Sequence, residues 1–265
     1  MSTTPAIAAL GALGALCGSG LYYLSKRYAT EMDERVDRVM EVLPGANCGA
    51  CGYGSCGVMA EAIVKAVDEV KRIPRCIQGG DEVASEIESI LGIEAEQPEK
   101  QISRLRCSGG RRCLDRFKYV GIDDCREVIF LSEEGDKACT YACIGHGTCA
   151  NLCPFDAITM GDDSLPIIDR LLCRGCGLCV QECPRNVLEL SKIDDHFIVS
   201  CSSLDTGKDV RKICEMGCIA CKICEKNCPV DAVHVIDNLA VIEPEKCTGC
   251  AICYEKCPRK VIFPI

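Results

Sequence analysis

Two tandem cysteine runs near the C-terminal end constrain the fold of this 265-residue chain more than any other feature. Each has the spacing C-x2-C-x2-C-x3-C-P, one over Cys218–Pro229 and the other over Cys247–Pro258. Thiolates at this spacing bind [4Fe–4S] clusters, and the fourth cysteine of each run reaches the cluster of the other run. The predicted ligand sets are therefore Cys218, Cys221, Cys224 and Cys257 for one cluster, and Cys247, Cys250, Cys253 and Cys228 for the second.

The preceding region repeats the same pattern. Its segments Cys139–Ile158 and Cys173–Val187 match Cys214–Val233 and Cys247–Val261 in order. Each half is therefore expected to form a ferredoxin-like unit with two [4Fe–4S] clusters. Short apolar runs follow the cysteine groups and predict the short strands of such a unit. These runs are Ala157–Met160, Val187–Leu190, Ala232–Ile236 and Val261–Ile265.

The first half departs from the repeat at one ligand position. His146 stands where the second half has Cys221, so one thiolate is missing. The preferred substitute is Cys139, while ligation by His146 and a surface role for that histidine are the alternatives. The predicted sets in this half are Cys139, Cys143, Cys149 and Cys183 for one cluster, and Cys153, Cys173, Cys176 and Cys179 for its partner.

A separate cysteine group precedes the repeat and has the spacing C-x2-C-x4-C-x19-C. Cys48, Cys51 and Cys56 lie in a glycine-rich loop between two amphipathic helical patterns, and Cys76 follows the second pattern. Four thiolates suit either zinc or an iron–sulfur cluster. A [4Fe–4S] cluster is favoured over zinc because the group shares a chain with ferredoxin-type motifs.

The N-terminal segment Pro5–Leu24 holds 20 residues without a charge. As a helix it would extend about 30 Å, the thickness of a bilayer core. Lys26 and Arg27 follow it, which predicts a single membrane span with the bulk of the chain on the cytoplasmic side. That compartment is reducing, so the cysteines are expected to bind metal rather than to form disulfides.

Composition and missing motifs exclude several classes of function. A net charge of −9 argues against nucleic acid as a partner. The sequence contains no phosphate-binding P-loop and no dinucleotide-binding glycine motif. We therefore expect no catalytic residues for hydride or group transfer on this chain, and cofactors that carry electrons only.

The first cysteine group, in L-P-G-A-N-C-G-A-C-G-Y-G-S-C with the downstream Cys76, resembles the Fe4S domain of the B subunits of the Rnf complex. The apolar segment before it and the cysteine runs after it are also similar to that family. The resemblance implies a subunit of an ion-translocating ferredoxin:NAD+ oxidoreductase, with soluble ferredoxin as the electron donor. Other Rnf subunits would then be its partners and would carry the flavins and the NAD site.

The alternative is a membrane-tethered polyferredoxin that serves a different, non-pumping reductase. A zinc-rich interaction scaffold is a third possibility. Visible absorption that is bleached when the protein is reduced would exclude it. The coupling ion, Na+ or H+, does not follow from the sequence.

The predicted fold class is α+β. It combines a transmembrane anchor over residues 1–28, a helical Fe4S domain over 29–80, an acidic helix and linker over 81–104, and ferredoxin-like units over 105–191 and 192–265. Five clusters use 20 of the 26 cysteines. The others are expected to be free thiols, with a sixth cluster as the alternative; they are Cys17, Cys107, Cys113, Cys125, Cys201 and Cys214.

Overall fold

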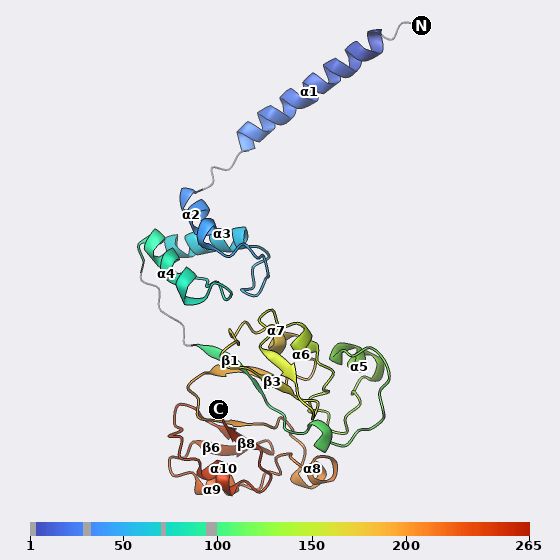
Figure 1. Ribbon diagram of the computed structural model, residues 1–265, viewed down its shortest axis with the longest axis vertical. Helices are drawn as coiled ribbons and strands as arrows, with labels where there is room; N and C mark the ends of the chain where they lie inside the picture. The colour runs from blue at the N-terminus through green and yellow to red at the C-terminus, as the bar shows by residue number, and fades with distance from the viewer. Residues whose placement is uncertain (1–3, 29–32, 70–72, 94–99) are drawn as a thin grey trace.

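The computed structural model describes residues 4–28, 33–69, 73–93 and 100–265, a chain of mixed helices and short strands (Figure 1). Helix α1 (Thr4–Tyr28) covers the predicted apolar segment. The side chains of Pro5–Leu10 lie outside the described part of that segment. Within the described residues, no helix combines the length and the apolar character needed to cross a membrane. The predicted transmembrane span is therefore not confirmed.

A helical module follows, built from α2 (Glu34–Val42), α3 (Cys56–Asp68) and α4 (Gly80–Leu91). Side-chain oxygens of Asp33 and Ser55 accept hydrogen bonds from backbone N–H groups of the first turns of α2 and α3, so both helices begin at a capping residue. The helices bury one shared apolar cluster, which includes Val36, Val39, Met59, Ile63 and Ile87.

The first ferredoxin-like unit pairs its outer strands β1 (Gln101–Leu105) and β4 (Leu188–Lys192) antiparallel. An inner hairpin joins β2 (Ile158–Met160) and β3 (Pro166–Ile168). Its helical turns are η1 (Gly110–Arg112), α5 (Cys125–Ser132), α6 (Thr148–Asn151) and α7 (Leu178–Gln181).

The second unit repeats this arrangement. Outer strands β5 (Phe197–Val199) and β8 (Ile262–Pro264) pair antiparallel, and β6 (Val233–Ile236) pairs with β7 (Leu239–Ile242). Its helices are α8 (Gly207–Ile213), α9 (Ile223–Asn227) and α10 (Ile252–Lys256). The four strands expected after the cysteine groups are thus present as β2, β4, β6 and β8.

Strand β1 differs from the expected boundary, because it begins inside the segment predicted to be a linker. Ile102 and Ser103 are almost fully buried, at 0% and 1% exposed. Leu105 lies opposite Leu188 of β4. The linker interpretation overlooked this strand because three of its five residues, Gln101, Ser103 and Arg104, are polar and it directly follows an acidic stretch.

The two units contact each other through equivalent segments of the repeat. Ser108 Oγ donates to the Ser200 carbonyl at 3.1 Å, and Ser202 Oγ donates to the Arg106 carbonyl at 2.9 Å. Ser200 Oγ also donates to the Leu105 carbonyl at 3.3 Å. The chain just after β1 therefore lies against the chain just after β5.

Replacement of Ile63 tests the core of the helical module. Ile63 is 0% exposed, so Ile63→Ala is expected to cost about 2–5 kcal/mol of unfolding free energy through lost burial and a cavity. Hydrogen exchange of the α3 amides in the full chain measures this loss. Val58→Ala is the matched control, since Val58 is 50% exposed on the same helix and should cost below about 0.5 kcal/mol. Equal protection in the two variants would contradict this packing.

Candidate iron–sulfur centres

The cysteine group of the helical module surrounds one pocket. All four predicted ligands line it, namely Cys48, Cys51, Cys56 and Cys76. Asn47 shapes the loop, because it adopts a left-handed φ of 48° while its Oδ1 accepts the Cys56 N–H at 2.8 Å. The Gly79 N–H points at the Cys76 sulfur at 3.3 Å. The loop thus directs backbone donors as well as thiols toward the site.

In the second unit, the structure brings together cysteines of different runs as the motif predicts. One pocket is lined by three cysteines of the first run and the last of the second: Cys218, Cys221, Cys224 and Cys257. In the partner group, Cys247 and Cys250 are electrostatic neighbours of Cys253. Cys228 packs against the same apolar cluster as Cys253.

The first unit contains one group that follows the repeat. Cys179 has Cys153, Cys173 and Cys176 as its electrostatic neighbours. Ser103 of β1 contributes to this group, since its N–H donates to the Cys173 sulfur at 3.4 Å. The four cysteines predicted for this cluster therefore lie together.

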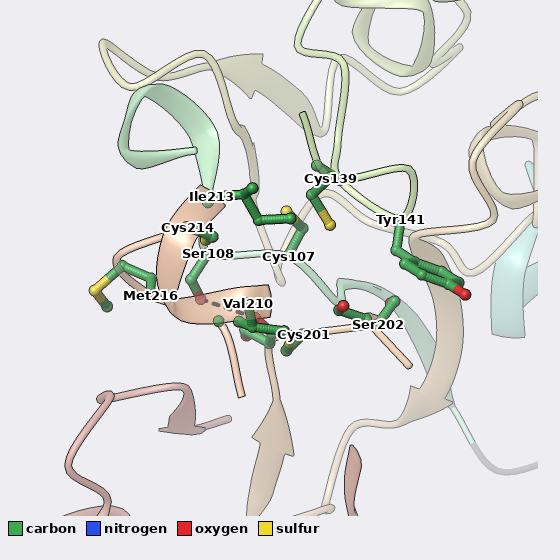
Figure 2. A pocket seen from close by; sticks show the side chains of 15 residues that line it. Cys107, Ser108, Cys139, Tyr141, Cys201, Ser202, Val210, Ile213, Cys214 and Met216 are labelled. Atoms are coloured by element: carbon green, nitrogen blue, oxygen red, sulfur yellow. Dashed lines mark hydrogen bonds between the residues drawn. The ribbon is translucent and has the colours of Figure 1, made fainter. Parts of the chain in front are cut away.

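The other group in this unit differs from the sequence prediction. One pocket is lined by Cys143, Cys149 and Cys183, and its fourth cysteine is Cys125 rather than Cys139. Cys139 instead lines a separate cavity with Cys107 (Figure 2). The spacing argument missed Cys125 because this residue lies in a long segment, between Leu105 and Cys139, that the second unit lacks.

His146 does not occupy the missing ligand position either. Its Nδ1 lies 2.6 Å from Asp123 Oδ1 and its Nε2 lies 3.4 Å from Asp136 Oδ2. Tyr119 packs edge-on against the imidazole, with ring centroids 5.2 Å apart. Both ring nitrogens are therefore engaged by carboxylates.

Burial disfavours free thiolates in these sites. It raises the pKa of Cys149 and of Cys224 to about 12 each, and raises the pKa of Cys143 well above its ordinary value. Positive iron reverses this preference, because a ligating thiol is deprotonated by the metal. Metal binding would thus convert buried neutral thiols into ligands.

The number of thiols fits a [4Fe–4S] cluster. Each of three pockets is lined by four cysteines. A [4Fe–4S] cluster has four irons, each of which takes one cysteine.

Comparison with protein families locates the same regions. Residues 43–72 match a family described as "Putative Fe-S cluster". Residues 142–188 and 217–262 match a "4Fe-4S dicluster domain" family, and residues 172–232 match a second family of the same description. These matches support an iron–sulfur cluster in the helical module and [4Fe–4S] clusters in both ferredoxin-like units.

Whole-chain relatives are similar along nearly the full sequence. The B subunit of the ion-translocating oxidoreductase complex of Methanosarcina acetivorans is 42% identical over 97% of this chain and 96% of its own length. The B subunit of the Na(+)-translocating ferredoxin:NAD(+) oxidoreductase complex of Acetobacterium woodii is 39% identical, over 90% of this chain and 71% of its own length. A proton-translocating counterpart from Clostridium ljungdahlii is 40% identical, over 89% and 82%. The chain therefore belongs to the family of Rnf complex B subunits, as an iron–sulfur electron-transfer subunit of an ion-translocating oxidoreductase.

Proposed function

We propose that this chain accepts electrons from reduced ferredoxin and relays them through [4Fe–4S] clusters to partner subunits of a membrane-bound ferredoxin:NAD+ oxidoreductase. The observation that carries the proposal is the succession of four-cysteine groups along a chain 39% to 42% identical to such B subunits. The clusters supply one-electron chemistry when bound. The protein's own residues hold, space and shield them.

Hydride transfer to NAD+ requires a dinucleotide site, and the sequence offers none of the usual motifs for one. The flavins and the NAD site are therefore assigned to partner subunits. The docking site of soluble ferredoxin is assigned to the ferredoxin-like units. These units are farther from α1 in the sequence than the helical module is. Electrons would then pass from those units to the helical module and on to the partners.

Helix α1 is proposed as a single membrane anchor. The 20-residue uncharged sequence of Pro5–Leu24 supports this role, and the flanking Lys26 and Arg27 support a cytoplasmic position for the rest of the chain. For the ferredoxin-like region we propose one revision of the domain limits, because β1 pairs with β4. The first unit then begins at Gln101 rather than at residue 105.

Cys125 is the proposed fourth ligand beside Cys143, Cys149 and Cys183. A hydrogen-bonded chain fixes its position: the Cys125 N–H donates to Thr148 Oγ1 at 2.7 Å, and that hydroxyl donates to Asp124 Oδ1 at 3.0 Å. Thr148 is 2% exposed and directly precedes Cys149. The Arg126 guanidinium, hydrogen-bonded to Asp124, lowers the pKa of that carboxyl to about 2 and keeps it an acceptor. The structure thus links the two cysteines through one threonine.

Loss of the Thr148 hydroxyl tests this link. Thr148→Val leaves the buried Cys125 N–H without its acceptor, a change worth about 1–3 kcal/mol, so the cluster should release iron to a chelator faster than in the unaltered chain. Thr148→Ser keeps the hydroxyl and should restore slow release. The exposed Thr140 provides the matched control Thr140→Val, with no effect expected. Identical release rates in all variants would contradict the positioning role.

Double replacement tests whether Cys125 shares a cluster with Cys143. Cys125→Ala and Cys143→Ala should each remove about four iron atoms per chain, and the double variant should also remove about four, because all belong to one cubane. Iron and acid-labile sulfide are measured on anaerobically purified protein. A loss of about eight in the double variant, or full iron in Cys125→Ala, would assign Cys125 elsewhere.

The direction of electron flow is tested with Cys51→Ala in the assembled complex. This variant should lose ferredoxin-dependent NAD+ reduction while ferredoxin still bleaches the visible absorption of the remaining clusters. Cys17→Ala is the control, because Cys17 lies in α1 outside all cysteine groups. Undiminished NAD+ reduction would remove the helical module from the path. Failure of ferredoxin to reduce any cluster would place that module at the point of entry.

A further inference from the structure

A further group of thiols lies where the two ferredoxin-like units meet. Its members are Cys107, Cys113, Cys139 and Cys214, and all pack in one apolar cluster. The first three are buried, at 8%, 2% and 7% exposed, and all three precede residue 142, where the first dicluster match begins. Cys214 falls within the match to residues 172–232, and the fold brings it together with three thiols that lie outside every family match.

Backbone pairing brings two of these cysteines together from different units. Cys113 and Cys214 face each other in an isolated antiparallel bridge. The bridge is flanked by hydrogen bonds from Leu114 N–H to the Ile213 carbonyl at 2.8 Å and from Glu215 N–H to the Arg112 carbonyl at 3.1 Å. Side chains of such a directly opposed pair lie on the same face of the two strands.

Gly109 shows that a third thiol converges on the same place. A Cβ added there would lie 3.1 Å from Cys113 Cβ, 3.5 Å from Cys214 Sγ and 3.6 Å from Cys107 Sγ. Cys139 completes the group, with Cys107 and Cys214 among its electrostatic neighbours. Every member is thus adjacent to at least two others.

Three of these thiols, those of Cys107, Cys139 and Cys214, line one pocket (Figure 2). Both units contribute to its lining, with Cys107 and Cys139 from the first and Ile213 and Cys214 from the second. The pockets at the cysteine groups described above are likewise lined by several cysteines. The site is therefore similar to them in donor type.

Each thiol also has backbone donors, as cluster ligands require for charge stabilisation. The Cys143 N–H donates to Cys107 Sγ at 3.3 Å, and the backbone of Cys139 donates to Cys113. Backbone N–H groups of Tyr141 and Met216 reach Cys139 and Cys214.

Two arginines at equivalent positions of the repeat flank the group. Arg259 donates to the carbonyls of Cys214 and Gly217, and Arg185 donates to the carbonyl of Thr140, next to Cys139. Their guanidinium groups place positive charge beside both thiols that come from repeated segments. This charge offsets the negative charge that four thiolates would bring into a buried site.

We infer that Cys107, Cys113, Cys139 and Cys214 ligate a sixth [4Fe–4S] cluster, which joins the two ferredoxin-like units into one electron path. The inference rests on the proposed function for its role in electron flow, but the site itself depends only on the four thiols. Cys107 accepts the N–H of Cys143, a ligand of the first unit, and Cys214 stands four residues before Cys218, a ligand of the second. One electron would enter from one unit and leave to the other, with no bond formed or broken.

Cys201 provides the matched control. It lines the same cavity, yet its sulfur accepts the Cys218 N–H at 3.3 Å and it packs in the core cluster of the second unit. Its place in the repeat is that of Cys107. Its leading electrostatic neighbours are Cys218 and Cys107, and Cys139 and Cys214 are not among them.

The test counts iron and acid-labile sulfide in the anaerobically purified, full-length chain. About 24 iron atoms are expected in the unaltered chain, about 20 in Cys113→Ala and about 24 in Cys201→Ala. Cys113→Ala/Cys139→Ala should also retain about 20, because both belong to one cluster, whereas Cys113→Ala/Cys125→Ala should fall to about 16. Electron paramagnetic resonance of the reduced variants shows whether the remaining clusters are intact. Cys113→Ser is the second variant if Cys113→Ala fails to fold.

About 20 iron atoms in the unaltered chain, unchanged by Cys113→Ala, would overturn the sixth cluster and leave the five proposed clusters in place. A disulfide-linked peptide pair containing Cys113 and Cys214 from anaerobic protein would also overturn it. A loss of about four iron atoms in Cys201→Ala would replace the proposed ligand set. Iron far below about 20 in the unaltered chain would instead contradict the proposed function itself.

Discussion

Ligation of iron by thiolates is the interaction on which both ferredoxin-like units depend. Their sheets are two-stranded, and strands such as β2, β3, β5 and β8 contain only three residues. Sheets of this size are at best marginally stable alone. The core of the second unit is built in part from cysteines, among them Cys218, Cys224, Cys253 and Cys257. Because a cluster crosslinks these thiols only in the folded state, its binding free energy becomes folding free energy.

The backbone conformation around the thiols is also suited to ligation of a cluster. Equivalent positions of the four runs adopt a left-handed φ, at Gly145, Gly175, Ala220 and Gly249. A second set of equivalent positions, after the Cys-Pro pairs, does the same at Asp156, Asn186, Asp231 and Lys260. Left-handed residues other than glycine cost about 1–2 kcal/mol each. Successive N–H groups in such turns form anion-binding concavities, so the strain directs donors toward the sulfurs and is offset when a cluster is bound.

Most of the fold and most of the groupings of cysteines could be predicted, because the spacing of a cysteine run is itself a geometric constraint. Residues such as Cys221 and Cys257 have to meet once their runs bind two clusters. Cys125 could not be predicted in this way, since it reaches its site through a long segment without a counterpart in the second unit. Its position is indicated only by local contacts. Asp124 caps the helix that starts at Cys125, and the Thr148 hydroxyl, next to Cys149 in the sequence, accepts the Cys125 N–H.

The position of Cys139 likewise depends on tertiary contacts that no spacing reports. Four residues before Cys143, it is close enough in sequence to replace the missing ligand. The docking of the two units places it instead near Cys107 and Cys214, across a junction held by Ser108 and Ser200. Cys139 therefore lines the pocket at this junction and not the pocket that Cys143 lines.

An anomalous-scattering map of the intact iron-loaded protein, recorded at the iron edge, would locate every cluster at once. Six separate iron peaks are expected, with one in the cavity between Cys107 and Cys214 and another beside Cys125. Five peaks, with no iron at the junction of the two units and with Cys139 and Cys143 bound to the same cluster, would contradict this arrangement of ligands.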